Sequence, residues 1–202
     1  MKFPGYLTVA ACLSISIGSA HARTTIEASS MTNPAPSEAF NRFDHFDVKP
    51  ISMAAPFSGQ SANETALKKI QENLDLRLKP MLASWNAMPV KNTVMRTLLI
   101  EPRVESIKFI GGAARFWAGA FAGSSGVLIK VKFSDPSTGQ LIAEPEFYQH
   151  ANAWGGAYSI GGTDNAMLVR EATLIADYIN ANFANAVGGR TGVEDPRDLK
   201  KQ

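Results

Sequence analysis

The chain has 202 residues, with 20 basic and 18 acidic side chains and a single cysteine. This length suits one domain with a proper hydrophobic core, and the nearly neutral balance of scattered charges gives no electrostatic reason to expect a nucleic-acid partner. Cys12 lies inside the N-terminal leader described next, so the mature chain is expected to form no disulfide and to carry no thiol for catalysis or metal binding.

Residues 1–22 have the pattern of a secretory signal peptide. Lys2 provides the positive start, Tyr6–Ile17 is an apolar run too short to span a bilayer, and Ala20-His21-Ala22 is a small-x-small cleavage pattern. We therefore predict cleavage after Ala22 and export to the periplasm. The alternative is cleavage before Cys12, after Val9-Ala10-Ala11, which would make the protein a lipoprotein anchored to the outer membrane.

Residues 23–42 are rich in Ser, Thr, Pro and Ala and poor in large apolar groups, which predicts a flexible spacer. Phe43, Phe46 and Val48 then alternate imperfectly with polar residues, so a first strand is expected to end at Pro50. A loop should follow over residues 52–62.

A helical period begins at Asn63, which is a plausible N-cap. Pro80 should kink or shorten the last turn. Six apolar residues recur at steps of three and four and predict a stripe that packs on a sheet: Leu67, Ile70, Leu74, Leu78, Met81 and Trp85.

Three extended segments follow. Met95–Phe109 is apolar enough for a strand, in which Pro102 suggests a bulge or an edge. Val127–Phe133 alternates, with Val127, Ile129, Val131 and Phe133 on one face and Leu128, Lys130 and Lys132 on the other. Asp135–Gly139 has strong turn chemistry, so residues Leu141–His150 should return antiparallel to the preceding strand.

Asn152–Gly162 holds four glycines and is predicted to be a loop. Thr163 or Asp164 can cap a second helix, and the charged residues 185–202 are expected to be a disordered tail. The apolar face of that helix should carry Leu168, Ala172, Ile175, Ile179 and Phe183. The order of elements predicts a single α+β domain over residues 43–184, with a small, mostly antiparallel sheet of about four strands and two helices packed on one face.

The most unusual segment, Ile110–Gly126, alternates glycines with alanines and aromatic residues. It lacks the lysine that a phosphate-binding loop needs, and Arg115 makes membrane insertion costly. We interpret it as a connection lying over the sheet, in which Arg115 either pairs with Glu101 or Glu105 or contacts a ligand. The candidate interaction surface consists of Arg115, Trp117, Gly119, Phe121 and Gly123.

Other candidate groups are dispersed. Three aromatic residues, Tyr148, Trp154 and Tyr158, could line a ligand groove for a saccharide or peptide, although interior packing explains them equally well. His45 and His150 occupy different strands without metal-ligand spacing, so no metal and no cofactor is predicted. The strand carboxylates are sufficient for a hydrolase, but solvated or salt-bridged faces explain them more simply: Asp44, Asp47, Glu101, Glu105, Glu144 and Glu146.

Between Phe43 and Phe183 the chain resembles the bacterial envelope family called domain of unknown function 4410. An Arg-x-x-x-Gly-x-x-x-Gly run, Arg115 to Gly123, precedes a strand and an Asp-x-x-x-Gly turn. The resemblance rests on three runs: Thr97–Glu105, Gly111–Gly123 and Val127–Gly139. It implies an exported protein, often a lipoprotein, with no assigned reaction, cofactor or catalytic residue.

These observations predict a non-catalytic exported protein that acts as an accessory, scaffold or interaction component of the Gram-negative periplasm or membrane surface. Its partner is expected to be another envelope protein or a second copy of the chain. Membrane attachment is expected only through a lipidated Cys12. The alternatives are a small-ligand or glycan-binding periplasmic module and, with less support, a carboxylate-dependent hydrolase.

Overall fold

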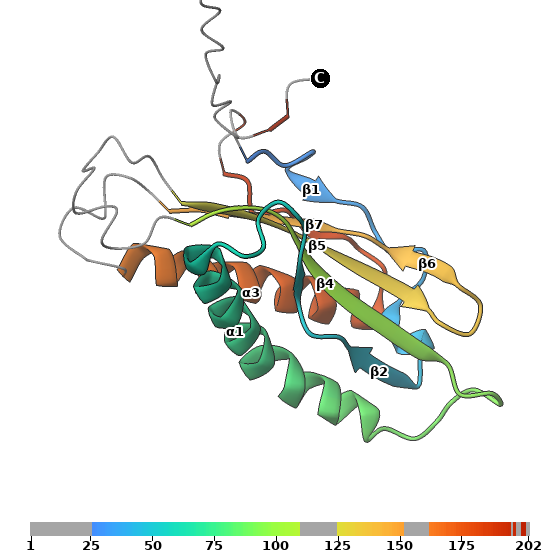
Figure 1. Ribbon diagram of the computed structural model, residues 1–202. Helices are drawn as coiled ribbons and strands as arrows, with labels where there is room; N and C mark the ends of the chain where they lie inside the picture. The colour runs from blue at the N-terminus through green and yellow to red at the C-terminus, as the bar shows by residue number, and fades with distance from the viewer. Residues whose placement is uncertain (1–25, 110–124, 152–161, 195, 197–198, 201–202) are drawn as a thin grey trace, which may run out of the picture.

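The computed structural model describes residues 26–109, 125–151, 162–194, 196 and 199–200. These residues form a mixed six-stranded sheet with two long helices on one face (Figure 1). The elements in chain order are β1 Thr32–Asn33, a 3-10 turn Phe40–Arg42, β2 His45–Val48, β3 Ser52–Met53, α1 Ser61–Asn86, β4 Thr97–Lys108, β5 Gly126–Asp135, β6 Gln140–Ala143, β7 Glu146–His150, α3 Gly162–Ala184 and β8 Gly189–Arg190.

The sheet is four strands wide. Its order is β2–β4–β5–β6, with β3 lying along β4 and β7 lying along β5. The predicted hairpin is confirmed, because β6 and β7 both return antiparallel to β5. The expectation of a mostly antiparallel sheet of about four strands holds only approximately, because β2 and β3 run parallel to β4. Helix α1 is the crossover that parallel neighbours require.

Pro102 lies where β4 has no partner on one side. β2 pairs with β4 as far as Ile100, and β3 resumes the pairing at Arg103. On the edge of β4 that faces β2 and β3, the carbonyl oxygens of Ile100 and Val104 accept hydrogen bonds. Pro102 lies midway between these two residues, so its backbone faces the gap between β2 and β3. A proline that cannot donate a hydrogen bond is therefore accommodated inside a central strand.

Helix α1 differs from the prediction at both ends. It begins at Ser61 with Gln60 as its N-cap residue, while Asn63 is buried and its Nδ2 donates to the Phe57 carbonyl at 3.1 Å. Pro80 does not shorten the helix, which continues to Asn86. The predicted apolar stripe is largely confirmed, with Ile70, Leu74, Leu78 and Trp85 buried and Leu67 and Met81 partly buried.

The two helices run parallel under the sheet. Lys69 Nζ donates to Asn165 Oδ1 at 2.6 Å, and Arg77 Nε donates to Thr173 Oγ1 at 3.0 Å. The second bond lies eight residues further along both helices, which requires a parallel arrangement. Together the helices cover the sheet face that carries Ile129, as predicted from the alternation in β5.

The terminal segments contradict the sequence prediction. The sequence predicts a flexible spacer over residues 23–42 and a disordered tail over residues 185–202, but in the described parts of these segments β1 pairs with β8 in a separate two-stranded sheet. Phe40 is fully buried and stacks on Phe133 with ring centroids 4.9 Å apart. The composition of these segments does not reveal their order, because a few buried apolar side chains suffice to dock a short segment on the sheet.

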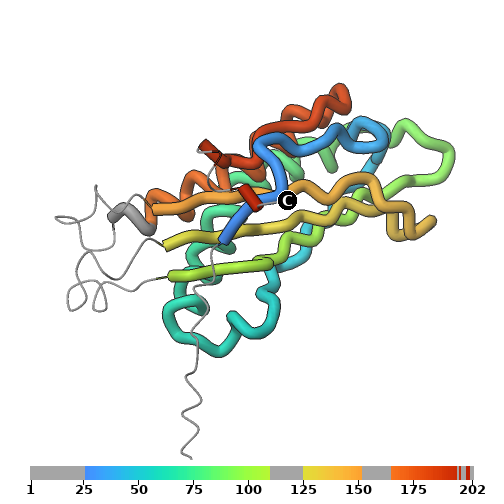
Figure 2. The backbone as a smooth tube through the Cα atoms, turned by 90° about the horizontal axis from the view of Figure 1, so that it is seen from above, coloured from blue at the N-terminus to red at the C-terminus, as the bar shows by residue number. Residues whose placement is uncertain are grey.

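Both terminal segments cross the sheet face opposite the helices (Figures 1 and 2). A second apolar cluster forms there from Ala28, Leu128, Tyr148 and Val193. The sheet therefore has a main core on its helical face and a small satellite core on the other.

Side-chain amides cover backbone groups at both edges of the sheet. Asn33 Nδ2 donates to the Glu146 carbonyl at 2.7 Å, and its Oδ1 accepts from the Glu146 N–H at 2.8 Å. At the opposite edge, Asn86 exchanges the same pair of bonds with Phe46, at 3.0 and 2.7 Å. Each amide thus imitates a strand residue and blocks pairing with another chain at that point.

Candidate functional site

Two of the segments that the sequence singled out are attached to the same end of the sheet. In the strand register Lys108 pairs with Gly126, and Gly126 pairs with His150. The connections 110–124 and 152–161 therefore both leave from this end, where α3 also begins. Arg170 ties the helix to β7 here, donating to Gln149 Oε1 at 2.9 Å and to the His150 carbonyl at 3.1 Å.

Most candidate contact residues lie outside the described residues. Tyr148 is an exception: it is 5% exposed and packs in the satellite core, and its backbone N–H donates to the Thr191 carbonyl at 2.7 Å. The interpretation of Tyr148 as a groove-lining aromatic is therefore wrong, because the terminal segments cover it. The candidate contact residues that lie outside the described residues are Arg115, Trp117, Gly119, Phe121, Gly123, Trp154 and Tyr158.

Four of the six strand carboxylates, Asp47, Glu101, Glu105 and Glu146, are engaged in ion pairs, as the salt-bridged interpretation predicted. Three of these pairs are Glu101–Lys132 at 3.3 Å, Glu105–Arg103 at 3.3 Å and Asp47–Lys49 at 2.9 Å. Asp44 instead accepts hydrogen bonds from N–H donors, and Glu144 is exposed.

Glu146 is the most enclosed member of the predicted carboxylate set. Its carboxylate accepts hydrogen bonds from the Ser29 N–H and hydroxyl and lies 3.2 Å from Lys130 Nζ. Burial favours the neutral form, but the bonds from Ser29 and Lys130 outweigh it and lower the pKa of Glu146. The group is thus held ionised as a link between the N-terminal segment and the sheet.

The two histidines do not meet. His45 pairs in register with Thr97 at the start of β4, whereas His150 is in register with Gly126 at the other end of the sheet. Among the described residues, no group of three His, Cys, Asp or Glu side chains is arranged to hold a metal ion. No helix in the described part of the chain is long and apolar enough to cross a membrane.

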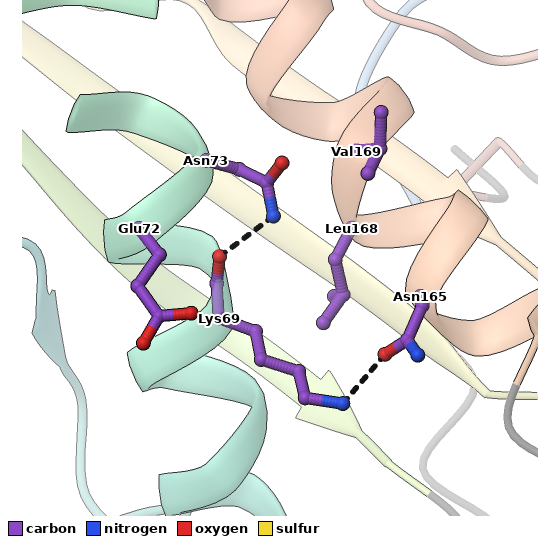
Figure 3. A pocket seen from close by; sticks show the side chains of 6 residues that line it. All are labelled: Lys69, Glu72, Asn73, Asn165, Leu168 and Val169. Carbon is purple, nitrogen blue, oxygen red and sulfur yellow. Dashed lines mark hydrogen bonds between the residues drawn. The ribbon is translucent and has the colours of Figure 1, made fainter. Parts of the chain in front are cut away.

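A shallow pocket of about 210 Å³ lies on the outer side of the seam between α1 and α3 (Figure 3). Lys69, Glu72 and Asn73 line it from α1, and Asn165, Leu168 and Val169 from α3. Lys69 reaches across to Asn165, while Asn73 donates back to the Lys69 carbonyl at 2.8 Å. These polar groups bind one another, so we interpret the pocket as part of the helix packing.

At the end of the sheet opposite the two connections, Asp44 anchors the loop of residues 87–96, hereafter the 87–96 loop. One carboxylate oxygen accepts from the N–H groups of Lys91 and Asn92, and the other from Asn92 Nδ2 and the Arg96 N–H. These bonds, led by that from Arg96, hold the pKa of Asp44 far below its usual range.

Arg96 continues this anchor into the sheet. It forms a bidentate pair with Glu38 at 2.9 and 2.8 Å, contacts Asp135 Oδ2 at 3.1 Å, and lies over the Phe43 ring at 4.3 Å. Bonds from Ser137 and then Arg96 lower the pKa of Asp135, which is 1% exposed. The sequence analysis overlooked this cluster because its members are far apart in the chain.

We expect Asp44→Ala to loosen the 87–96 loop without unfolding the sheet. Losing a charged acceptor for three backbone N–H groups should speed hydrogen exchange at Lys91, Asn92 and Arg96 by roughly tenfold or more. Exchange at core amides such as Ile129 should stay unchanged. Equal exchange in the wild type and the variant would show that Asp44 does not order the loop.

Glu171 is the unusual group of the main core. It lies within α3, has no exposed surface, and neither of its carboxyl oxygens has a hydrogen-bond partner in the described structure. Burial raises the pKa of Glu171 well above its ordinary value, and the positive charge of Arg170 opposes this rise only in part. The sequence does contain a signal for this group, since Glu171 falls between Leu168 and Ile175 on the apolar stripe.

No protein-family model matches the chain, and no curated protein matches it. The solved structures to which it is similar include a PelC dodecamer from Paraburkholderia phytofirmans, with 16% identity, 69% of this chain and 92% of that chain covered, and a TM-score of 0.33. A hypothetical protein from Chlamydia trachomatis has 7% identity, coverage of 68% and 98%, and a TM-score of 0.33. A candidate lipoprotein from Caulobacter crescentus has 13% identity, coverage of 67% and 91%, and a TM-score of 0.32. Likenesses this distant carry no functional argument, so the function must be argued from the chain itself.

Proposed function

We propose that this chain is a non-catalytic, exported envelope protein that acts by binding, as an accessory, scaffold or interaction component of the Gram-negative periplasm or membrane surface. The binding site lies at the sheet end from which the connections 110–124 and 152–161 leave. The leader pattern of residues 1–22 supports export, and the bacterial envelope family that the sequence resembles supports the compartment.

The observation that carries the proposed site is that these two connections leave from the same end of the sheet. They are the two segments richest in glycine and aromatic residues, and β4, β5 and β7 bring their ends together in adjacent register positions. A rigid sheet that presents two unusual connections at one end is a common way to build a recognition surface. The partner is another envelope protein or a second copy of the chain.

The state of the described carboxylates favours binding over hydrolysis. Hydrolysis by a carboxylate pair needs two groups free to exchange protons across a cleft. Instead, Glu101, Glu105 and Glu146 are paired with cations, and Asp44 is saturated by N–H donors. These carboxylates therefore stabilise the fold, whereas a hydrolase would need two of them free for proton transfer.

Site-specific photocrosslinking tests the proposal. A photoreactive residue replaces Lys108, which is exposed beside both connections, and the control replaces Leu76, which is 73% exposed on α1. We expect a discrete adduct in native cells from position 108 only, and we expect Arg115→Ala combined with Trp117→Ala to remove it at unchanged thermal stability. Equal adducts at both positions, or an adduct that survives the double substitution, would contradict the proposed site.

A further inference from the structure

The 87–96 loop exposes four large aliphatic side chains within eight residues. Met88 is 40% exposed, Val90 59%, Val94 77% and Met95 58%. Single exposed apolar side chains are ordinary on protein surfaces, but a cluster in one connection marks a surface that contacts an apolar environment.

The loop is held in place rather than merely connecting two elements. The four donors on Asp44 fix its second half, and Asn92 Nδ2 also donates to the Arg42 carbonyl at 3.1 Å. A fixed loop loses little conformational entropy on binding, so the exposed aliphatic groups are presented ready for contact.

The 87–96 loop projects from the molecule, which suits contact with an extended surface such as a membrane. Figures 1 and 2 both show the connection between α1 and β4 projecting beyond the β5–β6 turn as an outermost point of the molecule. The exposed aliphatic side chains are therefore carried by a projecting part of the chain.

The charges that reach solvent at the tip are positive. Lys91 is exposed within the loop and Arg42 is exposed beside it. The neighbouring carboxylates are set back: Asp44 holds the loop backbone, while Glu38 and Asp135 are paired with Arg96. A lipid headgroup layer would thus meet the cations first, and the aliphatic chains would enter beneath it.

We propose that the 87–96 loop docks on anionic phospholipid membranes, inserting Val90 and Val94 into the headgroup–acyl boundary while Lys91 and Arg42 contact lipid phosphates. This combination of buried aliphatic area and attraction to anionic headgroups is the one that binds peripheral proteins reversibly. The contact is independent of the proposed partner site, which lies at the opposite end of the sheet.

Vesicle co-sedimentation of the purified protein tests this inference. The probe is vesicles of phosphatidylethanolamine with phosphatidylglycerol, compared with vesicles of phosphatidylcholine alone. The test variant is Val90→Ser with Val94→Ser, and the matched control is Leu76→Ser with Val187→Ser, which removes two aliphatic groups 73% and 63% exposed elsewhere.

We expect binding to the anionic vesicles that weakens with salt, falls by roughly tenfold or more in the test variant and persists in the control. Lys91→Gln should weaken binding to anionic vesicles while leaving the fold intact. Absence of wild-type binding, or equal loss in both double variants, would overturn the proposal. The proposal would also be overturned if analytical ultracentrifugation showed a wild-type dimer that the test variant abolishes. The loop would then contact a second copy of the chain instead of a membrane.

Discussion

Asn182→Ala should lower the free energy of unfolding by about 3 kcal/mol, the cost of leaving several buried backbone groups without partners. Asn182 has no exposed surface and uses its whole amide. Its Nδ2 donates to the carbonyls of Tyr178 and Gly188 at 2.8 and 2.9 Å, and its Oδ1 accepts from the N–H groups of Val187 and Gly188, both at 2.8 Å.

This residue joins the last turn of α3 to the segment that becomes β8. Gly188 has a φ of 78°, and a Cβ atom there would collide with the Asn33 carbonyl oxygen, so the backbone path beside β1 is closely constrained. Without the amide, both the helix end and the docking of the terminal segments should weaken.

Urea unfolding at neutral pH measures the effect. Asn180→Ala is the matched control, because Asn180 is exposed two residues earlier in the same helix. We expect the control to stay within about 0.5 kcal/mol of the wild type. If both variants unfold at the same urea concentration, the amide contributes nothing beyond an ordinary helix residue.

Glu171→Met should raise the free energy of unfolding by about 1–3 kcal/mol at neutral pH. The substitution replaces a fully buried carboxyl group, which has no hydrogen-bond partner in the described structure, by an apolar side chain of similar length. Ile175 and Leu168 on the same helix face show that the surroundings suit a methionine.

The effect should depend on pH with a defined sign. Because burial raises the folded-state pKa of Glu171 well above its ordinary value of 4.5, the folded protein retains this proton where the unfolded chain has lost it. The contribution of protonated Glu171 to the free energy of unfolding is therefore fully present below about pH 4.5 and is lost as the pH rises through the folded-state pKa. Glu171→Gln should remove that dependence.

Unfolding experiments between pH 4 and pH 9 distinguish these outcomes. Asp177→Asn provides the control, since Asp177 is exposed on the same helix. A stability of the Glu171→Met variant that is below the wild type at every pH would show that the carboxyl group has a stabilising role.

The regular elements could be predicted because their signals are local. The three- and four-residue steps from Ile70 to Trp85 and the alternation from Ile129 to Phe133 reflect burial of one face, and the structure buries those faces. The turn before β6 follows from Asp135 and Gly139, whose φ is 72°.

The remaining features depend on residues that are distant in the chain. No local pattern shows that Phe40 will stack on Phe133, that β1 will pair with β8, or that β2 will lie parallel to β4. The anchoring of the 87–96 loop likewise requires Asp44 to meet Asn92, and the two candidate connections leave from one end of the sheet only because β4 and β7 both pair with β5.

The account rests most directly on export, and mass spectrometry of the N-terminus of the native protein tests it. We expect a mature chain that begins at Arg23 or, if the lipoprotein alternative holds, at an acylated Cys12, recovered from the envelope fraction. An intact chain beginning at Met1 and recovered from the cytosol would contradict the account.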